Sequence, residues 1–482
     1  MKIGYACIPL TVPYKTTRSF MIRNFSEDRF YKCVSENIED LKNILQCNVK
    51  NGIYLFRISS DIIPFGSHKI NNIKWWEIFK KQLSEIGQYI KEQGVRVSMH
   101  PGQYTVLNSP SSEVLDNSLR DIEYHCKFLD SLKLDYTHKI VLHIGGVYGD
   151  KKLSMKRFVD NFQKLSPSAK KRLILENDDK SYNIEEVLEI CNKLNIPAVF
   201  DNLHHRLNPP VNCEDAKERK RRYNQCTYHD TYLNQSDIKD TNGEGLKNYP
   251  DSKNTGKCSG NDKSAIEIKC DINNNTYVSG FSDVYIDDIF KRIKATWKEE
   301  DGAMKIHYSD KDTDKKGGSH SKFVLTENFL NYYKKIEKYQ PDIMLEVKDK
   351  DISAIKCANL IFNEGKRGVL YDEWARYKYL VMEKAYALYK KCSSLVRENC
   401  SLKEFYSFVD ACLSMPYNEK NFKNTAFHIW GYFKDCATDK EKRDFLNLMD
   451  EYKDPQKVKE KLYKLAVKYE REYLVESYYF AY

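Results

Sequence analysis

The sequence of 482 residues has no long uninterrupted apolar run. A membrane-spanning helix needs about 18 to 20 consecutive apolar residues, and no stretch approaches that length. The first residues, Met1–Tyr5, lead directly into a strand-like pattern and lack the charged and apolar regions of a secretory signal peptide. We therefore expect an intracellular protein that is neither secreted nor embedded in a membrane.

Closely spaced cysteine pairs are absent too. None of the 14 cysteines forms a Cys-x-x-Cys motif, and Cys126, Cys191 and Cys412 lie inside apolar helical patterns. A disulfide framework is typical of short secreted chains, and this chain is neither short nor expected to be secreted. We expect reduced thiols that are mainly structural.

Charge of one sign does not dominate the sequence. The 78 Lys and Arg residues exceed the 69 Asp and Glu residues, which gives a formal net charge of +9 at pH 7. This moderate basic balance permits a polyanionic partner without requiring one.

Eight short apolar segments are typical of strands, and they alternate with helical patterns over the first 346 residues. The expected strands are Lys2–Cys7, Tyr54–Ile58, Val95–Met99, Lys139–Leu142, Arg172–Leu175, Pro197–Phe200, Ala303–Ile306 and Asp342–Leu345. Helical patterns, with apolar residues at intervals of three and four, occur at Trp75–Gln93, Val114–Leu134, Ile184–Leu194 and Phe323–Tyr339. Repeated βαβ units form a parallel sheet, and eight of them can close into a (β/α)8 TIM barrel.

A polar segment interrupts this alternation at residues 209–280. It is rich in Asn, Asp, Lys and Ser, and we expect a surface insertion there. Its basic run Lys217–Arg222 could contact phosphate. Its Cys and His residues could bind zinc, although their spacing matches no strong pattern; they are Cys213, Cys226, His229, Cys258 and Cys270.

Residues 355–482 contain helical patterns and no series of strands. The expected helices are Trp374–Lys391, Leu402–Leu413, Phe422–Cys436, Lys440–Tyr452 and Pro455–Tyr473. A typical TIM barrel takes about 250 residues, so a chain of this length has room for a further domain. We predict a C-terminal all-α domain over residues 355–482 that follows a barrel domain over residues 1–350.

Histidines and carboxylates stand at the ends of the expected strands. They are His100, His143, Glu176, Asp201, His307 and Glu346. A parallel barrel gathers the C-terminal ends of its strands around one axis, so these side chains can meet in one pocket. Burying so many titratable groups is costly unless they are paired or bind a metal.

The residue types favour a particular kind of metal centre. Imidazole and carboxylate together suit Mn, Zn or Fe, whereas carboxylates alone would suit Mg or Ca. The number of candidates exceeds what one ion needs, which indicates two or three ions with bridging carboxylates. Clustered ions suit phosphoryl transfer, because one can activate water while the others neutralise developing charge.

Several motifs resemble those of the UV damage endonuclease family, in the family's order, over residues 1 to about 350. They are Gly4-Tyr5, Arg57-Ile58-Ser59-Ser60 with His68, Met99-His100-Pro101-Gly102-Gln103-Tyr104, His143-Ile144-Gly145-Gly146, Leu175-Glu176-Asn177-Asp178, Asp201-Asn202-Leu203-His204-His205 and Lys305-Ile306-His307-Tyr308-Ser309. The resemblance implies a TIM barrel with a trinuclear site, usually of manganese. It also implies an enzyme that nicks damaged double-stranded DNA immediately 5′ of a pyrimidine dimer and leaves a 3′-hydroxyl.

The resemblance further implies roles for individual residues. The metal ligands would be His68, His100, His143, Glu176, Asp201, His204, His307, His320 and Glu346. Lys305 matches a lysine that the family can carboxylate beside the metals, and with Glu176 and His143 it forms the expected catalytic set. Gln103 and Tyr104 match a pair that wedges into the duplex when damaged bases are flipped out. Tyr5 matches a tyrosine that lines the lesion pocket.

The cofactor expectation is two or three divalent ions, with Mn first and Zn, Mg or Co as alternatives. One departure from the family is Ala6-Cys7-Ile8-Pro9-Leu10, where many members carry an asparagine, so that a contact to the DNA is in doubt. In the C-terminal region, Trp374-Ala375-Arg376-Tyr377-Lys378 and His428-Ile429-Trp430-Gly431-Tyr432-Phe433-Lys434 resemble the helical YbgA-type domain.

Other functions fit parts of the pattern. A sugar isomerase or an abasic-site endonuclease could use a similar barrel; the Gln103-Tyr104 pair and the basic balance disfavour the first, and the motif order disfavours the second. A noncatalytic damage-binding protein is disfavoured because no expected ligand is missing.

Overall fold

The structure is a computed structural model, and it describes residues 1–210, 283–312, 318–450 and 454–482. Residues Met1–Pro210 and Phe281–Tyr482 form one compact unit. The predicted polar insertion, with its basic run and its Cys and His residues, lies almost entirely outside the described residues.

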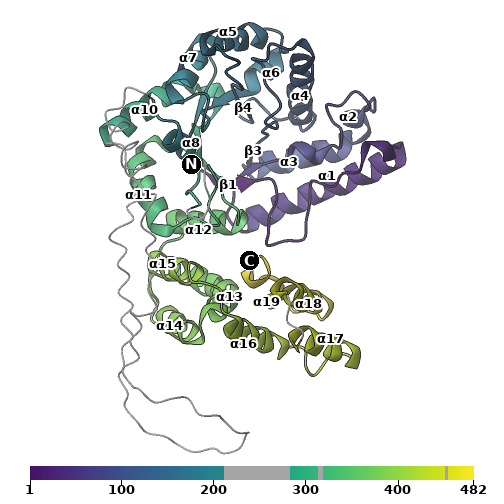
Figure 1. Cartoon of the computed structure of the whole chain (residues 1–482), viewed down its shortest axis with the longest axis vertical. Helices are drawn as coiled ribbons and strands as arrows, with labels where there is room; N and C mark the ends of the chain where they lie inside the picture. The colour runs from purple at the N-terminus through teal and green to yellow at the C-terminus, as the bar shows by residue number, and fades with distance from the viewer. Residues whose placement is uncertain (211–282, 313–317, 451–453) are drawn as a thin grey trace, which may run out of the picture. The chain divides into compact units, whose positions relative to one another are not determined.

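Eight parallel strands form the barrel that the sequence predicts (Figure 1). They are β1 Ile3–Ala6, β2 Leu55–Arg57, β3 Arg96–Ser98, β4 Ile140–His143, β5 Leu173–Glu176, β6 Ala198–Asp201, β7 Lys305–Tyr308 and β8 Asp342–Leu345. Their hydrogen-bonded order is β3-β2-β1-β8-β7-β6-β5-β4. Strands that are consecutive in sequence pair with each other, except for β3 and β4, and β1 pairs with β8. The prediction of a (β/α)8 fold is confirmed.

The seam between β3 and β4 is closed by a short bridge. Met99 pairs with Ile140 in parallel orientation, and the Met99 amide donates to the Lys139 carbonyl at 3.1 Å. The Val141 amide in turn donates to the Met99 carbonyl at 3.0 Å. These bonds connect the backbone hydrogen bonds of β3 to those of β4 and close the barrel.

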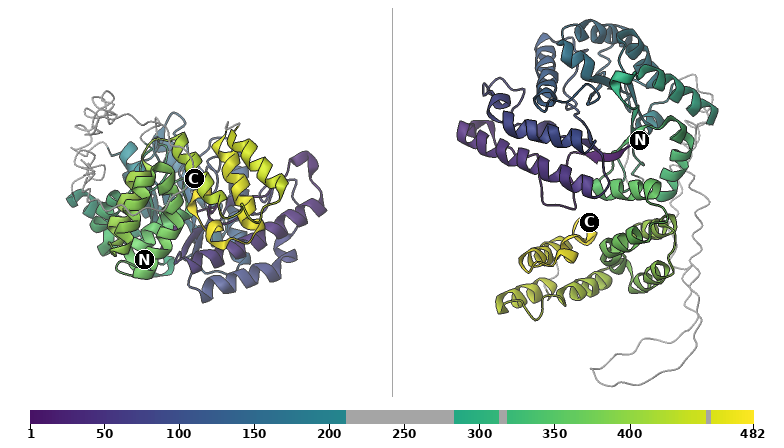
Figure 2. Two further views of the ribbon diagram at one scale, coloured as in Figure 1. Left: turned by 90° about the horizontal axis from the view of Figure 1, so that it is seen from below. Right: turned by 180° about the vertical axis from the view of Figure 1, so that it is seen from behind.

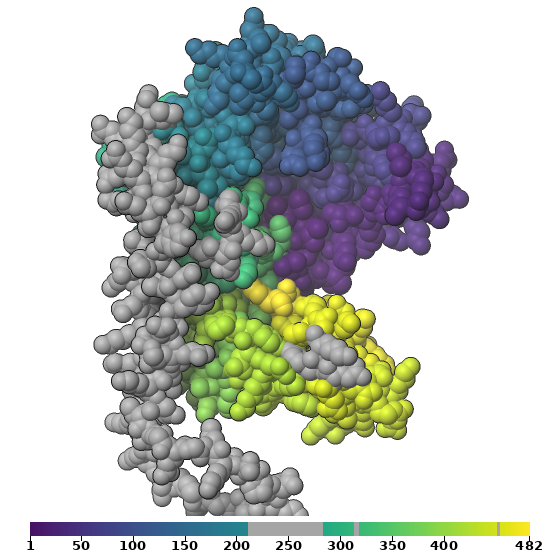
Figure 3. All heavy atoms as spheres, in the orientation of Figure 1, coloured from purple at the N-terminus to yellow at the C-terminus, as the bar shows by residue number. Residues whose placement is uncertain are grey.

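Helices surround the strands, as the view from behind in Figure 2 shows. Those of the barrel region are α1 Glu27–Lys50, α2 Trp75–Ile78, α3 Lys80–Glu92, α4 Ser112–Ser131, α5 Lys151–Phe162, α6 Pro167–Arg172, α7 Ile184–Leu194, α8 Asn202–Leu207, α10 Asp283–Thr296, α11 Thr326–Ile336 and α12 Asp351–Phe362. Several begin at a side-chain cap: in α7, Asn183 accepts from Glu185 and Glu186 amides while the Glu186 side chain accepts from the Asn183 amide. Figure 3 shows the purple-to-teal part of the chain as a continuous surface on the face in view.

Helix α12 is buried on nearly all sides. Ten of its twelve residues are buried, including Ile352, Ile355 and Leu360. It packs against β1 on one side and against α15, Leu402–Leu413, on the other. The buried Lys356 ammonium in α12 pairs with the Asp410 carboxylate in α15, so the two helices are joined by charge as well as by apolar contact.

The C-terminal region is helical, as predicted. Its elements are α13 Arg367–Lys384, α14 Tyr386–Arg397, α15 Leu402–Leu413, α16 Glu419–Trp430, α17 Asp439–Asp450, α18 Pro455–Lys468 and α19 Glu472–Val475. The predicted single helix Trp374–Lys391 is wrong, because Ala385 is extended (φ −164°, ψ 139°) and separates α13 from α14. In the part of the chain that the structure describes, no helix is both long and apolar enough to cross a membrane.

The N-terminal ends of the strands carry a buried ionic network. The Arg96 guanidinium donates to the Asp342 carboxylate at 2.9 Å and to the carbonyls of Ala303 and Asp301. The Lys139 ammonium lies 2.5 Å from the Asp301 carboxylate. Each of these charges therefore has an oppositely charged partner at hydrogen-bond distance.

Candidate metal centre

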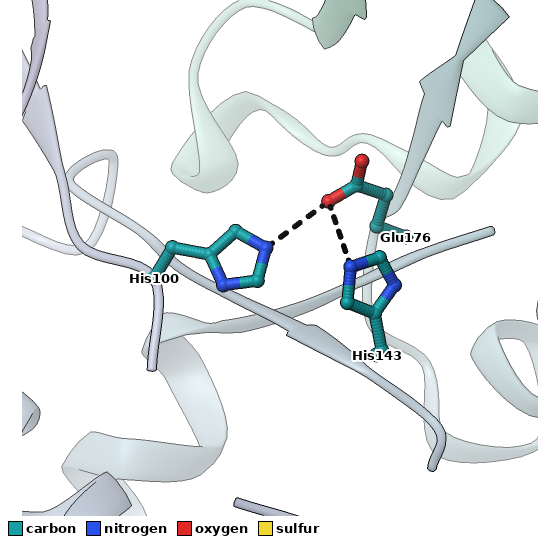
Figure 4. Close-up of side chains that lie close together, drawn as sticks. All are labelled: His100, His143 and Glu176. Carbon is teal, nitrogen blue, oxygen red and sulfur yellow. Dashed lines mark hydrogen bonds and ion pairs between the residues drawn. The ribbon is translucent and has the colours of Figure 1, made fainter. Parts of the chain in front are cut away.

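Glu176, the last residue of β5, lies at the centre of the cluster at the C-terminal ends of the strands. Its carboxylate is buried, and histidines from two neighbouring segments approach the same oxygen: His100 Nε2 lies 3.3 Å and His143 Nε2 3.8 Å from Glu176 Oε2. Figure 4 shows both imidazole rings pointing at this oxygen. Their positions follow from the chain, because His143 ends β4 and His100 follows the bridge at Met99.

The other oxygen of Glu176 faces two further histidines. His307 Nδ1 in β7 lies 2.8 Å from Glu176 Oε1, and His204 Nδ1 lies 3.5 Å from it. His204 is held in place locally: Asp201 caps α8, and its carboxylate accepts the His204 amide at 2.7 Å. One carboxylate is therefore surrounded by four imidazoles.

Two more carboxylates complete the cluster. Asp201 Oδ1 lies 3.7 Å from His204 Nδ1, and Glu346 Oε1, just after β8, lies 3.2 Å from His307 Nδ1. The potential ligand atoms fall into three groups that all include Glu176, and within each group the atoms lie within 4.8 Å of one another. The groups are His100, His143 and Glu176; Glu176, Asp201 and His204; and Glu176, His307 and Glu346.

Several buried atoms in and beside this cluster have no protein partner among the described residues. They are His143 Nδ1, Asp201 Oδ2 and His320 Nδ1. Unpaired buried polar atoms are costly and call for an explanation such as a bound ion. The set of imidazole and carboxylate donors therefore fits a centre of divalent metal ions.

The surroundings perturb the protonation of the cluster strongly. Burial favours the neutral form of Glu176, but His307, His143 and hydrogen bonds from His100 and His204 lower its pKa well below the usual range. Burial raises the pKa of Asp201 to about 7, with Glu176 and Glu346 adding to the effect. Burial lowers the pKa of His307 to about 4, so its imidazole is neutral and able to bind a metal.

Lys305 lies one layer below the cluster. It is two residues before His307 on β7, is buried, and donates from Nζ to the Ser98 hydroxyl of β3 at 2.5 Å. Burial lowers the pKa of this ammonium well below its ordinary value, and Arg57 and Arg96 lower it further. The structure thus places Lys305 beneath the candidate ligands, as a neighbour and not as one of the three groups.

Arg57 is a site residue to which the sequence analysis gave no role. At the end of β2, its guanidinium pairs with Glu346 and lies 3.1 Å from His307 Nε2. The signal was present, since Arg57 follows the apolar pair Leu55-Phe56 as the expected ligands follow their own strands. An arginine is not a metal ligand, so a search for ligand residue types does not identify a cation that positions them.

Two predicted ligands lie at or outside the edge of the cluster. His320 is one-third exposed, and its Nε2 lies 3.6 Å from Glu346 Oε2. His68 is exposed in the loop after β2; its Nδ1 accepts the Ile70 amide and its ring contacts Phe65. The structure therefore brings together seven of the nine predicted ligands, places His320 beside them and leaves His68 apart.

Of the predicted DNA-contacting residues, two are exposed and one is buried. Tyr104 is 83% exposed in the loop between β3 and α4, and Gln103 beside it is exposed too. Tyr5 is fully buried, and its hydroxyl donates to Asn48 of α1 at 2.9 Å. Tyr5 presents no exposed surface here, because β1 turns this side chain toward the outer helices. Its contact with the lesion stays a prediction.

Comparison with known proteins agrees with the site. Residues 1–240 match the family model described as UV-endonuclease UvdE, and residues 378–482 match a model described as a protein of unknown function (DUF1722), the YbgA-type domain of the sequence prediction. A UV DNA damage endonuclease of Clostridium perfringens (strain 13 / Type A) is 42% identical over 474 residues, covering 98% of this chain and 97% of that protein. A UV DNA damage endonuclease of Bacillus cereus (strain G9842) is 36% identical over 216 residues, covering 43% of this chain and 68% of that protein.

Among solved structures, the crystal structure of SacUVDE is similar, with a TM-score of 0.57 and 32% sequence identity. The likeness covers 75% of this chain and 98% of that one. From its sequence, its barrel and its cluster, this chain belongs to the UV DNA damage endonuclease family.

Proposed function

We propose that this protein is a metal-dependent DNA repair endonuclease. It would hydrolyse the phosphodiester bond immediately 5′ to UV photoproducts, and to other lesions that distort the duplex, leaving a 3′-hydroxyl. The observation that carries the proposal is the three ligand groups that share Glu176 at the C-terminal end of the barrel. Active sites of TIM barrels lie at this end.

The residues that would hold the ions are those of the three groups. Glu176 would take part in holding each ion, together with two further residues. These are His100 and His143 for the first ion, Asp201 and His204 for the second, and His307 and Glu346 for the third. His320 lies beside Glu346. The mixed donor set favours Mn²⁺ first, with Zn²⁺, Mg²⁺ or Co²⁺ as alternatives. Bound divalent ions supply an activated water and neutralise the charge that develops on the phosphate.

The protein's own residues would orient this machinery. Arg57 fixes the carboxylate of Glu346 and the ring of His307, and Asn177 fixes Asp201 by accepting its amide at 2.9 Å and donating to its carbonyl. Lys305, buried directly below, would react with CO₂ to form a carbamate and release a proton. That carbamate would add a carboxylate beside the ligands, and with Glu176 and His143 it would complete the catalytic set.

Gln103 and Tyr104 would recognise the lesion. An exposed ring and amide can replace the stacking and pairing that are lost when damaged bases leave the duplex. A lesion that is already weakly stacked costs less to extrude, which gives preference for damaged double-stranded DNA. The protein would act inside the cell, where the DNA is.

We also propose that residues 1–350 form the catalytic domain and residues 355–482 an accessory helical domain. All candidate ligands lie at or before Glu346. The contacts of α12 with α15 indicate that the helical region also covers an apolar face of the barrel.

One experiment tests the function directly. The purified protein would be incubated with Mn²⁺ and duplexes that carry a single pyrimidine dimer, a single abasic site or no damage. We expect one nick, 5′ to the dimer, with a 3′ end that a polymerase extends. Cleavage of the abasic duplex alone would favour an abasic-site endonuclease, and lesion binding without a nick would favour a noncatalytic damage-binding protein.

A further inference from the structure

The loop between β4 and α5, residues 144–150, carries an exposed aromatic residue on the same face as the metal ligands. Tyr148 stands five residues after His143 and is 46% exposed. Its backbone φ is +50°, a left-handed conformation that side chains other than Gly, Asn and Asp seldom adopt. Such a residue costs free energy, and where the surrounding structure imposes it, a functional role is a reasonable hypothesis.

The loop is held rigidly by its neighbours. The Gly146 carbonyl accepts from the Asn108 side-chain amide at 2.7 Å and from the Tyr182 hydroxyl at 3.1 Å. Asn108 is fully buried and belongs to the same β3–α4 loop as Tyr104. At Gly145, an added Cβ would lie 2.4 Å from the Asn108 side chain, so the two loops can approach this closely only with glycine there. The loop that carries Tyr148 is thus bonded to the loop that carries the proposed wedge.

A guanidinium lies over the Tyr148 ring. The Arg157 carbon Cζ, from the second turn of α5, is 5.7 Å from the ring centroid. Arg157 is itself positioned by donating from Nε to the Asn108 carbonyl at 2.9 Å and from Nη2 to the Ser154 hydroxyl at 2.7 Å. The planar Arg157 guanidinium and the Tyr148 ring therefore lie together at a partly exposed surface.

The charged side chains in the first two turns of α5 are all positive, and the exposed Asp160 follows them in the third turn. Lys152 and Lys156 are exposed on α5, which lies beside α7 in Figure 1. Lys151 is paired with Glu186 at 2.8 Å, and Asp150 is occupied in capping the helix through the Leu153 amide. A polyanion that approaches the metal ligands would therefore meet cations on this side.

From these observations we infer that Tyr148 and Arg157 form a second DNA-binding site, which contacts the sugar-phosphate backbone of the duplex beside the lesion. Arg157 binds a phosphate, and the Tyr148 ring packs against the adjoining nucleotide. The inference rests on the proposed function, because it takes DNA as the substrate. It differs from the wedge in that it does not depend on damage.

The test measures binding to an undamaged duplex, which the proposed activity does not cut. Fluorescence anisotropy with a labelled duplex over a series of salt concentrations gives the affinity and its salt slope. For Arg157→Gln we expect the slope of log K against log[salt] to fall by about one, as for loss of one phosphate contact. Arg157→Lys should retain the slope, because the charge remains.

The tyrosine is tested by removing its ring where its backbone favours glycine. Tyr148→Gly should weaken binding roughly fivefold or more, as for loss of one stacked ring, and leave the slope unchanged. Its melting temperature should stay close to that of the wild type, because glycine adopts φ +50° without strain and this gain offsets its larger loss of conformational freedom on folding. Tyr54→Ala, which removes an exposed tyrosine just before β2 at the opposite end of the barrel, should bind as the wild type does.

The outcomes separate this inference from the proposed function. If the wild type nicks the dimer duplex while Arg157→Gln and Tyr148→Gly bind undamaged DNA with wild-type affinity and slope, the second site is refuted and the activity stands. If the wild type does not nick but its DNA binding depends on both residues as expected, the second site stands and the activity is refuted.

Discussion

The two ends of the barrel use buried charge in opposite ways. At the N-terminal end, Arg96 is matched by Asp342 and by backbone carbonyls, and Lys139 by Asp301. At the C-terminal end, four imidazoles crowd one carboxylate, and within the described residues Asp201 Oδ2 and His143 Nδ1 have no partner. Breaking a matched buried pair is destabilising, whereas buried polar atoms that lack a partner call for a ligand, so this difference distinguishes the structural end from the functional one.

The largest difference between the ends should appear on changing Glu176, which belongs to all three ligand groups. Glu176→Gln should abolish nicking, because a neutral amide neither bridges ions nor balances their charge. Metal analysis after reconstitution in Mn²⁺ should show at least two ions per wild-type chain and fewer in the variant. Without metal, the variant should still fold but unfold at a lower denaturant concentration than the wild type, because the surrounding histidines stabilise the ionised carboxylate that the amide replaces.

The stabilisation that is lost on metal removal gives a second comparison of the two ends of the barrel. Saturating Mn²⁺, at about 100 times its dissociation constant, should stabilise the wild type by roughly 2.7 kcal/mol per independent site and Glu176→Gln by less. The matched control Glu300→Gln, an exposed glutamate at the N-terminal end, should respond as the wild type does. Fewer than two ions bound to the wild type would contradict a multinuclear centre.

At the other end, breaking a balanced pair should cost stability and leave chemistry intact. Asp342→Ala would leave the buried Arg96 cation without its carboxylate and should lower the free energy of unfolding by about 3 to 5 kcal/mol. Denaturant unfolding measures this loss, and the folded variant should still bind metal.

The pair of Lys335 and Asp283, 2.6 Å apart and with Asp283 79% exposed, provides the control. Asp283→Ala should cost less than about 1 kcal/mol, because solvent screens an exposed pair. Equal losses in Asp342→Ala and Asp283→Ala would show that the N-terminal network does not stabilise the barrel as its burial indicates.

A smaller effect should separate lesion recognition from metal binding at the functional end. Tyr104→Ala should reduce the preference for a dimer-containing duplex over an undamaged one by about 1 to 3 kcal/mol, without changing the metal content. Tyr417→Ala, which removes a half-exposed tyrosine in the helical region, should retain the preference. An unchanged preference in Tyr104→Ala would exclude the wedge.

The smallest expected effect is a pH dependence at the structural end. Burial lowers the pKa of His138 to about 4, with Arg96 and Arg172 adding to the shift and Asp135 opposing it. Its Nδ1 accepts the Val97 amide at 3.1 Å, which needs the neutral ring. A pKa lowered by folding means that stability is complete above the unfolded value of 6.5 and is lost as the pH falls toward about 4.

Between pH 7.5 and pH 5.5 this single group should lower the free energy of unfolding by about 1 kcal/mol. His138→Gln keeps an acceptor for Val97 but does not titrate, so its stability should change less over the same interval. Urea unfolding of both proteins at the two pH values gives the comparison, and identical changes would assign the pH dependence to other groups.

Much of the fold was predictable from local patterns. All eight strands lie within about two residues of their expected positions, because most are short, largely apolar runs followed by a polar residue. The break at Ala385 was not predictable in this way, since alanine is a strong helix former and the apolar pattern continues through it.

The candidate site was predictable to the extent that ligands end strands. His100, His143, Glu176, Asp201, His307 and Glu346 do so and meet as expected. His68 lies in a loop eleven residues after β2, where the sequence sets no direction for the side chain, and the structure leaves it exposed. His68 remains a predicted ligand only through the family resemblance.

The sequence by itself determined where the strands end and which charged side chains stand there, because strand length and residue type are local properties. Only the tertiary structure decided which face of its strand each side chain occupies. Both faces of a parallel barrel strand are buried, so its sequence lacks the alternation that would distinguish them. In β1, Ala6 pairs with Arg57 and Tyr5 with Phe56. Side chains alternate along a strand, so Arg57 at the metal centre and Tyr5 against α1 lie on opposite faces, a division that packing imposes and composition does not encode.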